Sequence, residues 1–501
     1  MNKLFNFILI TALLFSACSK TPVIELPVTT SSPKALEYYK RAMDYYLTTD
    51  FPEGWAMLDS ALVLDPQFAM ASVWRWHPDP NIRTKNRNKA YSLIDSVSRA
   101  EQDMLKANKF EDSGNLDSAL FYIKKLVDEN PNSYEAYNEL GTIYGQRNEL
   151  GLSEKAFKKA IEINPNNYKA YTYLFGQHVT YGYYYLLPVE DRDINKGLGY
   201  AKKLIKMKPN RAHGYHAKAN CYRQIGDFEK AIPLYDKSVE LSKGTTSEAA
   251  ENYVSAHNIM FAGDFEAARK RYKKALGVVK NFQTEKSIKQ FITISYLFQR
   301  NFEGALDNLY SMEGDFVVNE NLDESYLLWE LRQIERLKFI CYAHNQMESE
   351  AKKALDKAIG LNEKYVMMSQ DESRKKEHRV FKTYNKAWND ILFGNYSSAK
   401  EKLAELNKLA GSYKNPTAFD GYYGLMGMLH LMEGNTELSE QAFRKGDKRD
   451  VYFNYFKALS LRANGKKEDA KEILTAISSE NFSYLELALV KVLAQEQLQK
   501  L

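Results

Sequence analysis

The segment that most constrains the fold is residues 134–167, which has the pattern of two helices joined by a short polar turn. In its first half, an aromatic residue, a leucine, a glycine and a second aromatic residue fall on one stripe of a helix, at i, i+3, i+4 and i+7. These residues are Tyr137, Leu140, Gly141 and Tyr144. In its second half, Phe157 and Ala160 follow the turn, and Pro165 ends the helix because proline has no N–H to donate. One such hairpin cannot bury its own apolar stripe, so further copies must stack on it.

The order and spacing of these residues resemble the tetratricopeptide repeat, a 34-residue helix–turn–helix unit. Gly141 stands where the resemblance implies a close approach of a neighbouring helix. Eleven recognisable copies and one degenerate copy, residues 69–99, cover most of the chain. The resemblance therefore predicts an all-α fold, a right-handed superhelical solenoid of stacked hairpins.

The copies form two stretches, predicted as an N-terminal solenoid over residues 34–312 and a C-terminal solenoid over residues 324–501. The polar residues 313–323 between them are expected to form a loop. The segment from Tyr484 onward has a helical pattern and is expected to cap the last hairpin. In several copies a glycine followed by Asp or Asn stops the first helix, and Arg300 replaces that glycine in one copy.

The first residues have the pattern of a signal peptide. Lys3 precedes an apolar run from Leu4 to Phe15, which is shorter than the ~20 residues that a membrane-spanning helix needs. The run ends in Ser16-Ala17-Cys18, which resembles the lipobox of bacterial lipoproteins. The resemblance implies cleavage after residue 17 and lipidation of Cys18, with several acyl chains giving stable anchoring. The alternative is an ordinary secretory signal with a chance cysteine.

Residues 18–33 are rich in Pro, Thr and Ser and are predicted to be a disordered tether. Ser19 is not the aspartate of an inner-membrane retention signal, and no acidic run follows Cys18. The expected location is therefore the outer membrane, facing the periplasm. The other two cysteines, Cys221 and Cys341, are far apart in the array and are predicted to be free, buried thiols.

Net charge is +5 with dispersed basic residues, which does not favour nucleic acid as a partner. The common phosphate-binding, hydrolase, zinc-protease and dinucleotide motifs are missing from the sequence. Residues 191–197 superficially resemble a calcium loop, but their glycine is one place late, which favours a solvated loop. His213, His216 and His257 could lie near one another, yet no further ligand is placed to complete a zinc site, so neutral groove histidines are favoured.

In the tetratricopeptide family the first helices of the hairpins line a concave groove, and the resemblance implies which side chains face it here. The candidate groove residues are Asn138, Thr142, Gln146, Thr172, Tyr173, His216, Asn220, Arg223, Tyr253 and His257. This polar and aromatic set with one cation suits an extended peptide or a sugar ring; alternatively, the residues are merely solvated helix faces. Tyr181 and Tyr183–Tyr185, in an insertion between two helices, could form a lip on the groove or pack against their own helix ends.

These features predict a non-enzymatic, lipid-anchored scaffold that holds a protein or extended-peptide partner at the bacterial cell envelope. An alternative is a glycan-binding lipoprotein subunit of an outer-membrane uptake system, although the long irregular insertions that build the sugar site in such subunits are missing. An enzyme with a hidden site is disfavoured because stacked hairpins leave no closed, desolvated pocket. No cofactor and no metal are predicted, and a small-molecule partner is not expected.

Overall fold

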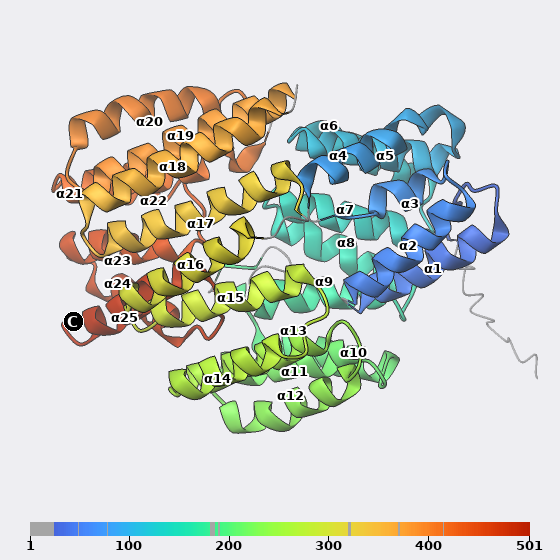
Figure 1. The fold of residues 1–501 in the computed structure, drawn as a ribbon, viewed down its shortest axis with the longest axis horizontal. Helices are drawn as coiled ribbons and strands as arrows, with labels where there is room; N and C mark the ends of the chain where they lie inside the picture. The colour runs from blue at the N-terminus through green and yellow to red at the C-terminus, as the bar shows by residue number, and fades with distance from the viewer. Residues whose placement is uncertain are drawn as a thin grey trace, which may run out of the picture.

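The computed structural model of the protein describes residues 25–48, 50–77, 79–180, 186–188, 191–318, 322–368, 371–413 and 415–501. Within these residues it contains 25 α-helices, a few short 3₁₀ turns and no β-strand. The predicted all-α solenoid of helical hairpins is confirmed (Figure 1). Cys18 and Tyr181–Tyr185 lie outside the described residues.

The helices form twelve successive hairpins, followed by one further helix. The first helices are α1 (Pro33–Leu47), α3 (Ala69–Trp74), α5 (Arg99–Asp112), α7 (Tyr134–Gln146), α9 (Tyr168–Val179), α11 (Ala212–Gln224), α13 (Glu248–Phe261), α15 (Phe282–Leu297), α17 (Glu324–His344), α19 (Glu372–Leu392), α21 (Asp420–Met432) and α23 (Val451–Ala463). The second helices are α2 (Phe51–Leu64), α4 (Pro80–Ser92), α6 (Leu116–Glu129), α8 (Leu150–Ile163), α10 (Ile194–Met207), α12 (Phe228–Ser242), α14 (Phe265–Leu276), α16 (Phe302–Val317), α18 (Glu348–Met367), α20 (Tyr396–Ala410), α22 (Thr436–Phe443) and α24 (Lys467–Ser479). The last helix is α25 (Leu485–Leu498).

The turn inside a hairpin is formed by two adjacent residues, of which the first has a positive φ and the second caps the next helix. Gly226 adopts φ +79°, and Asp227 then caps α12 by accepting a hydrogen bond from the Lys230 N–H. Arg300 occupies the glycine position before α16 and adopts φ 55°, and Asn301 caps that helix. This position of the turn therefore adopts the left-handed backbone conformation even where the sequence does not supply glycine.

Packing within a hairpin depends on one small residue facing one large ring. A Cβ atom at Gly141 would lie 2.8 Å from the Phe157 ring, so only glycine lets α8 sit this close to α7. Phe157 is fully buried. The predicted close approach at Gly141 is confirmed, and its partner is the second helix of the same hairpin.

The stack of hairpins turns back on itself, so that α15–α25 lie beside the first half of the chain (Figure 1). Polar contacts link segments far apart in sequence: the Thr246 N–H donates to Glu53, and the Ser325 hydroxyl donates to Asp79 at 3.2 Å. Helix α25 packs against α15 as well as against its neighbours α23 and α24. The array is therefore closed by contacts between distant hairpins.

The loop predicted over residues 313–323 is shorter than expected, because α16 continues to Val317. One continuous apolar core runs from Ala249 to Ala494 and includes buried side chains on both sides of this loop, such as Met312 and Tyr326. The packing of the described residues thus continues across the position that separates the two predicted solenoids.

Part of the predicted tether is ordered. Residues 25–32 lie extended against the first helices, and three carboxylates accept their backbone N–H groups. The Leu26 N–H donates to Glu135, the Thr29 N–H to Glu101 and the Ser31 N–H to Asp65, with the last two N···O distances at 2.8 Å. The expectation of disorder is wrong for these residues, because their backbone donors are satisfied and the Leu26 side chain is buried.

Cys221 and Cys341 are free and fully buried, as predicted, and burial raises the pKa of each thiol to about 12. Across the described segments, no helix is both long and apolar enough to cross a membrane.

Candidate functional site

The structure buries half of the ten predicted groove residues. Five of them expose less than a tenth of their surface: Asn138, Thr172, Asn220, Arg223 and His257. The other five are half-buried: Thr142, Gln146, Tyr173, His216 and Tyr253. The expectation that this set faces an open groove is therefore wrong for the first five residues.

The buried amides are satisfied inside the repeats. Asn138 and Asn167 exchange side-chain hydrogen bonds of 3.3 and 2.9 Å, and Asn167 also caps α9. The Tyr235 hydroxyl donates to Asn220 at 2.7 Å, across the hairpin of α11 and α12. These side chains point toward the neighbouring helix or the next repeat, so they hold the stack together.

The half-buried members are also engaged. The Thr142 hydroxyl donates to the Asn138 carbonyl at 2.9 Å, and the Gln146 amide donates to Glu111. The Tyr173 ring lies 4.6 Å from Phe157, and the Tyr253 ring stacks on Phe291 at 5.0 Å. The Thr172 hydroxyl, in the buried group, likewise bonds to the Tyr168 carbonyl.

Arg223 contacts a segment from the far end of the chain. Its guanidinium lies 4.6 Å from the centre of the Phe482 ring, and Asn481 donates to the Arg223 carbonyl at 3.0 Å. Burial lowers the pKa of Arg223 below its usual range. Arg223, the one cation of the predicted groove, is thus covered by Asn481 and Phe482 of the same chain.

The three histidines have separate environments. His213 Nδ1 lies 2.8 Å from the Tyr168 hydroxyl, and His216 Nδ1 lies 3.0 Å from Glu251. Burial lowers the pKa of His213 to about 4 and that of His257 well below its usual value, so both are neutral. Among the described residues, no group of three His, Cys, Asp or Glu side chains is arranged to hold a metal ion. In the calcium-like loop, Asp193 caps α10 by accepting from the N–H groups of Asn195 and Lys196.

An open pocket lies elsewhere, between α17 and α19, the first helices of two successive hairpins. It has a volume of about 400 Å³. Its lining residues are Arg332, Gln333, Arg336, Glu377, Val380, Phe381, Tyr384, Asn385 and Tyr413. We call it the α17/α19 pocket. The α19 members recur at i, i+3, i+4, i+7 and i+8, so one stripe of that helix faces the opening.

Arg332 forms the floor of the α17/α19 pocket. Its guanidinium lies 4.1 Å from the Trp329 ring and 4.9 Å from the Phe381 ring. Burial lowers the pKa of Arg332 to about 10, which still leaves it charged at neutral pH. The guanidinium also donates from Nη1 to Asn362 Oδ1 at 3.4 Å, so the cation is held in place by two rings and one amide.

Several polar groups of this pocket lack partners in the protein. Arg332 is 8% exposed and Asn385 is 2% exposed, yet the Nε of the first and the Oδ1 of the second have no hydrogen-bond partner among the described residues. Gln333 and Arg336 are half-buried, and neither has a hydrogen-bond or ion-pair partner within the described part of the chain. Gln333 and Arg336 are therefore the polar groups that a ligand in this pocket can reach, whereas the Arg332 Nε and the Asn385 Oδ1 are buried away from solvent.

Sequence reasoning missed this pocket. The charged run 371–382 has the composition of a solvated helix face, whereas its Arg374 donates to Thr84 at 2.8 Å. The available signal was the aromatic stripe that continues from Phe381 through Tyr384 to Trp388. That stripe follows the same first-helix spacing as Tyr137 and Tyr144, and it would have placed Asn385 beside the rings.

Two segments of the chain, residues 134–167 and residues 212–245, match the tetratricopeptide repeat family. They correspond to the hairpins of α7 with α8 and of α11 with α12. A comparison with curated proteins finds no significant match.

Among solved structures, 268 chains match. One is a tetratricopeptide repeat protein from Parabacteroides merdae, with a TM-score of 0.36 and 15% identity, covering 56% of this chain and 98% of that one. Another is described as MamA MSR-1 C2, with a TM-score of 0.24 and 17% identity, covering 42% of this chain and 98% of that one. With twelve hairpins among its described residues and two matched repeats, the chain is an all-α solenoid of tetratricopeptide-type hairpins.

Proposed function

We propose that the protein is a non-enzymatic scaffold that binds a protein partner through the α17/α19 pocket. The observation that carries this proposal is the pair of half-buried polar side chains there without partners in the described chain, Gln333 and Arg336. Repeats of this type suggest protein–protein interaction, and this pocket is open, whereas Arg223 of the predicted groove is covered by the chain itself.

The chemistry of the pocket suits an extended peptide segment. The Gln333 amide offers a donor and an acceptor for a peptide group, while Arg336 offers donors for a carbonyl or carboxylate oxygen. Phe381, Tyr384 and Val380 provide an apolar and aromatic surface for a side chain of the partner. A segment with one acidic and one apolar side chain would bind both the positive charge and the apolar surface of the pocket.

We further propose that the scaffold is anchored to the outer membrane through a lipid on Cys18, facing the periplasm. The support is the lipobox-like sequence that follows the apolar run. Because residues 25–32 are docked on the first helices, the free tether from Cys18 would span at most ~25 Å. Such a tether would hold the solenoid close to the membrane surface.

The test of partner binding is site-specific photocrosslinking in intact cells. A photoreactive residue at position 333 lies in the pocket, and one at position 379 lies on α19 outside the pocket lining. A partner should be captured from position 333 and not from position 379. Equal capture from both positions, or none from 333, would place the binding surface elsewhere.

The test of anchoring is the Cys18→Ser variant. The native protein should incorporate labelled fatty acid and fractionate with membranes, and the variant should do neither. A variant that still incorporates label would refute the anchor.

A further inference from the structure

The basic residues are concentrated in one part of the solenoid, contrary to the dispersed distribution expected from the sequence. Residues 194–280, which form α10–α14, contain 17 Lys and Arg residues and 8 Asp and Glu residues, a net charge of +9. Because the whole chain carries +5, the remaining residues together carry −4. Figure 1 shows α10–α14 grouped at the lower edge of the molecule. The charge of this group is therefore opposite to that of the rest of the protein.

Six exposed lysines supply much of this charge. They lie in the last two turns of α10, at the C-cap of α12 and in the last turn of α14, and none has a hydrogen-bond or ion-pair partner among the described residues: Lys202, Lys203, Lys206, Lys243, Lys273 and Lys274. We call them the basic edge. The helix dipole favours a cation in the last turn of a helix, but Lys202 and Lys203 lie before that turn. The dipole therefore does not account for the whole set.

Contacts between the helix ends bring these lysines together. The Lys280 ammonium, which follows α14, donates to the carbonyl of Gly244, which follows α12. Arg211 after α10 and Ser247 after α12 both donate to Asp50, at 3.4 and 3.1 Å. The C-terminal ends of α10, α12 and α14 are therefore neighbours, so the basic edge is one surface.

The carboxylates of α12 and α13 do not neutralise the basic edge. Glu240 pairs with Lys237 at 3.0 Å. Glu248 is half-buried and accepts a backbone N–H at 2.8 Å. Asp236 is exposed, but it lies seven residues before Lys243, ~10 Å back along α12. Only Glu248 and Asp236 thus add negative charge from these two helices.

The carboxylates that approach from α1 and α2 are mostly paired. Asp44 pairs with Lys208, and Asp50 pairs with Arg211 at 3.4 Å, so these four charges cancel. Glu53 contacts the turn after α12 through hydrogen bonds and adds one negative charge. Three carboxylates without an ion pair among the described residues therefore face six lysines, and the edge is positive.

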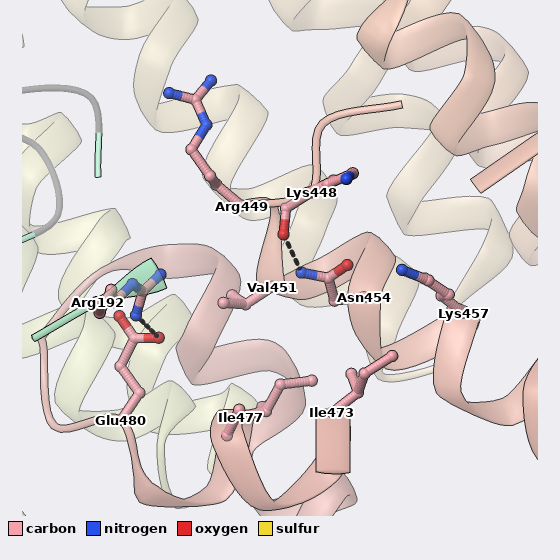
Figure 2. A pocket seen from close by; sticks show the side chains of 10 residues that line it. Arg192, Lys448, Arg449, Val451, Asn454, Lys457, Ile473, Ile477 and Glu480 are labelled. Atoms are coloured by element: carbon pink, nitrogen blue, oxygen red, sulfur yellow. Dashed lines mark hydrogen bonds and ion pairs between the residues drawn. The ribbon is translucent and has the colours of Figure 1, made fainter. Parts of the chain in front are cut away.

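The lysines of the basic edge lie outside both pockets. None of them lines the α17/α19 pocket or the pocket beside Arg192 and Glu480 that Figure 2 shows. Arg192 precedes α10 and pairs with Glu480 at 3.4 Å, so the cation at the other end of α10 is held by the chain itself. An array of exposed lysines on three helices suits a broad surface with many negative charges better than one small ligand.

We propose that the basic edge binds an anionic phospholipid surface. Each lysine gains electrostatic attraction near such a surface, and six in one array give a contact that salt weakens. The start of α2 contacts the turn after α12, and the end of α2 holds the docked residues 25–32, so the edge lies ~20 Å, the length of α2, from the tether. This contact does not require the lipid proposed on Cys18, and together with that lipid it would orient the solenoid on the membrane.

The test is vesicle sedimentation with the chain from residue 19 onward. This chain lacks Cys18 and the proposed signal peptide but keeps every residue that the structure describes, so the result does not depend on the lipid anchor. Vesicles of phosphatidylethanolamine with about 30% phosphatidylglycerol are compared with phosphatidylcholine vesicles. We expect saturable binding to the anionic vesicles in about 50 mM salt, and binding roughly tenfold or more weaker to phosphatidylcholine or in about 500 mM salt. Equal binding to both kinds of vesicle, or at both salt concentrations, would overturn the proposal.

Variants locate the contact. A triple variant reverses one charge at the end of each helix and should weaken binding to the anionic vesicles roughly tenfold or more: Lys206→Glu, Lys243→Glu and Lys273→Glu. The matched control changes the net charge equally, through three exposed lysines of α18 and α20 without a partner among the described residues: Lys352→Glu, Lys353→Glu and Lys408→Glu. Native affinity in the first variant, or an equal loss in the second, would overturn the proposal.

Poly-L-glutamate is the probe for an acidic protein as the alternative partner. Tighter binding to this polymer than to the anionic vesicles would assign the basic edge to an acidic protein and overturn the lipid proposal. Circular dichroism confirms that each variant is folded before its binding is measured.

Discussion

The guanidinium of Arg223 lies 4.6 Å from the centre of the Phe482 ring. This contact joins α11 to the short segment between α24 and α25, and it closes the solenoid on itself. The Phe482 ring belongs to a buried apolar cluster that also contains Tyr168, Phe175 and Cys221. Because repeat stability is built from contacts between neighbours, a contact between distant hairpins couples parts that would otherwise unfold separately.

Phe482→Ala tests this closure. We expect a loss of about 3 kcal/mol in the free energy of unfolding, because the substitution leaves a cavity in the cluster. Urea unfolding followed by circular dichroism measures it. Phe121→Ala is the matched control, since Phe121 is 63% exposed, and it should change stability by less than about 0.5 kcal/mol. If the two variants lose equal stability, Phe482 is not docked.

Arg223 gives a second test through two replacements of different size. Its side chain is 1% exposed, and its Nε has no hydrogen-bond partner among the described residues. Arg223→Met keeps most of the volume and removes a poorly compensated buried charge, so stability should stay equal or rise. Arg223→Ala should lose about 2–3 kcal/mol because it leaves a cavity. An unchanged melting temperature for Arg223→Ala would contradict this burial and would mean that Arg223 faces solvent in the predicted groove.

Gly141 tests the packing inside a hairpin. Gly141→Leu places side-chain atoms where Phe157 lies 2.8 Å from the ideal Cβ position, and should cost about 1–3 kcal/mol. Gly151 is the matched control, because nothing lies within 4 Å of its Cβ position on α8. Gly151→Leu should leave stability equal or slightly higher, since leucine favours a helix more than glycine does. Thermal melts of both variants measure these two changes in stability, and an equal change in both would contradict the close packing at Gly141.

Glu135, which contacts the docked N-terminal segment, should make the free energy of unfolding depend on pH. Burial raises the pKa of Glu135 from 4.5 to about 6, and its carboxylate accepts the Leu26 N–H. The folded state therefore holds this proton more tightly than the unfolded state, so the contribution to stability falls as pH rises through 4.5 to 6. Glu135→Gln keeps an acceptor without the charge and should be about 1–2 kcal/mol more stable than the native protein at pH 7.

The gain in Glu135→Gln should vanish below about pH 4.5, where the native carboxyl is protonated in both states. Glu162→Gln is the control for loss of a carboxylate, because the Glu162 side chain is 65% exposed, and it should change stability by less than about 0.5 kcal/mol. A gain that persists at low pH would mean that the charge of Glu135 is not its cause.

The sequence predicts the local fold well, because each hairpin is specified by residues close together in the chain. The stripe of Tyr137, Leu140, Gly141 and Tyr144 and the turn at Gly226-Asp227 define helices, register and turns without distant information. The prediction that Arg300 replaces a turn glycine agrees with its φ of 55°. Periodicity, together with the resemblance to the tetratricopeptide repeat, accounts for these successes.

The sequence could not predict how the ends of the array meet. Nothing near Arg223 indicates that Phe482 will cover it, and nothing near Leu26 indicates that Glu135 will accept its N–H. Both contacts depend on the curvature accumulated over many hairpins. The groove assignment is wrong for Arg223 for this reason. It is wrong for Asn220 because the Asn220 side chain points toward the second helix of its own hairpin.

Arg336 tests partner binding in the α17/α19 pocket. The side chain is half-buried and has no partner among the described residues, so Arg336→Ala removes a donor without breaking a contact in the protein. Stability should change by less than about 0.5 kcal/mol. Partner capture from crosslinked envelopes should fall roughly tenfold, because a hydrogen bond from a charged donor is lost.

Arg379→Ala is the matched control for Arg336→Ala. Arg379 is exposed on α19 and lies outside the pocket lining, about 200° around the helix from Glu377. It carries the same charge, so a general electrostatic effect on capture would appear equally in both variants, whereas a specific contact would appear only in Arg336→Ala. Full capture by Arg336→Ala would show that the partner does not use this pocket. A melting temperature that falls with capture would instead make Arg336 a structural residue.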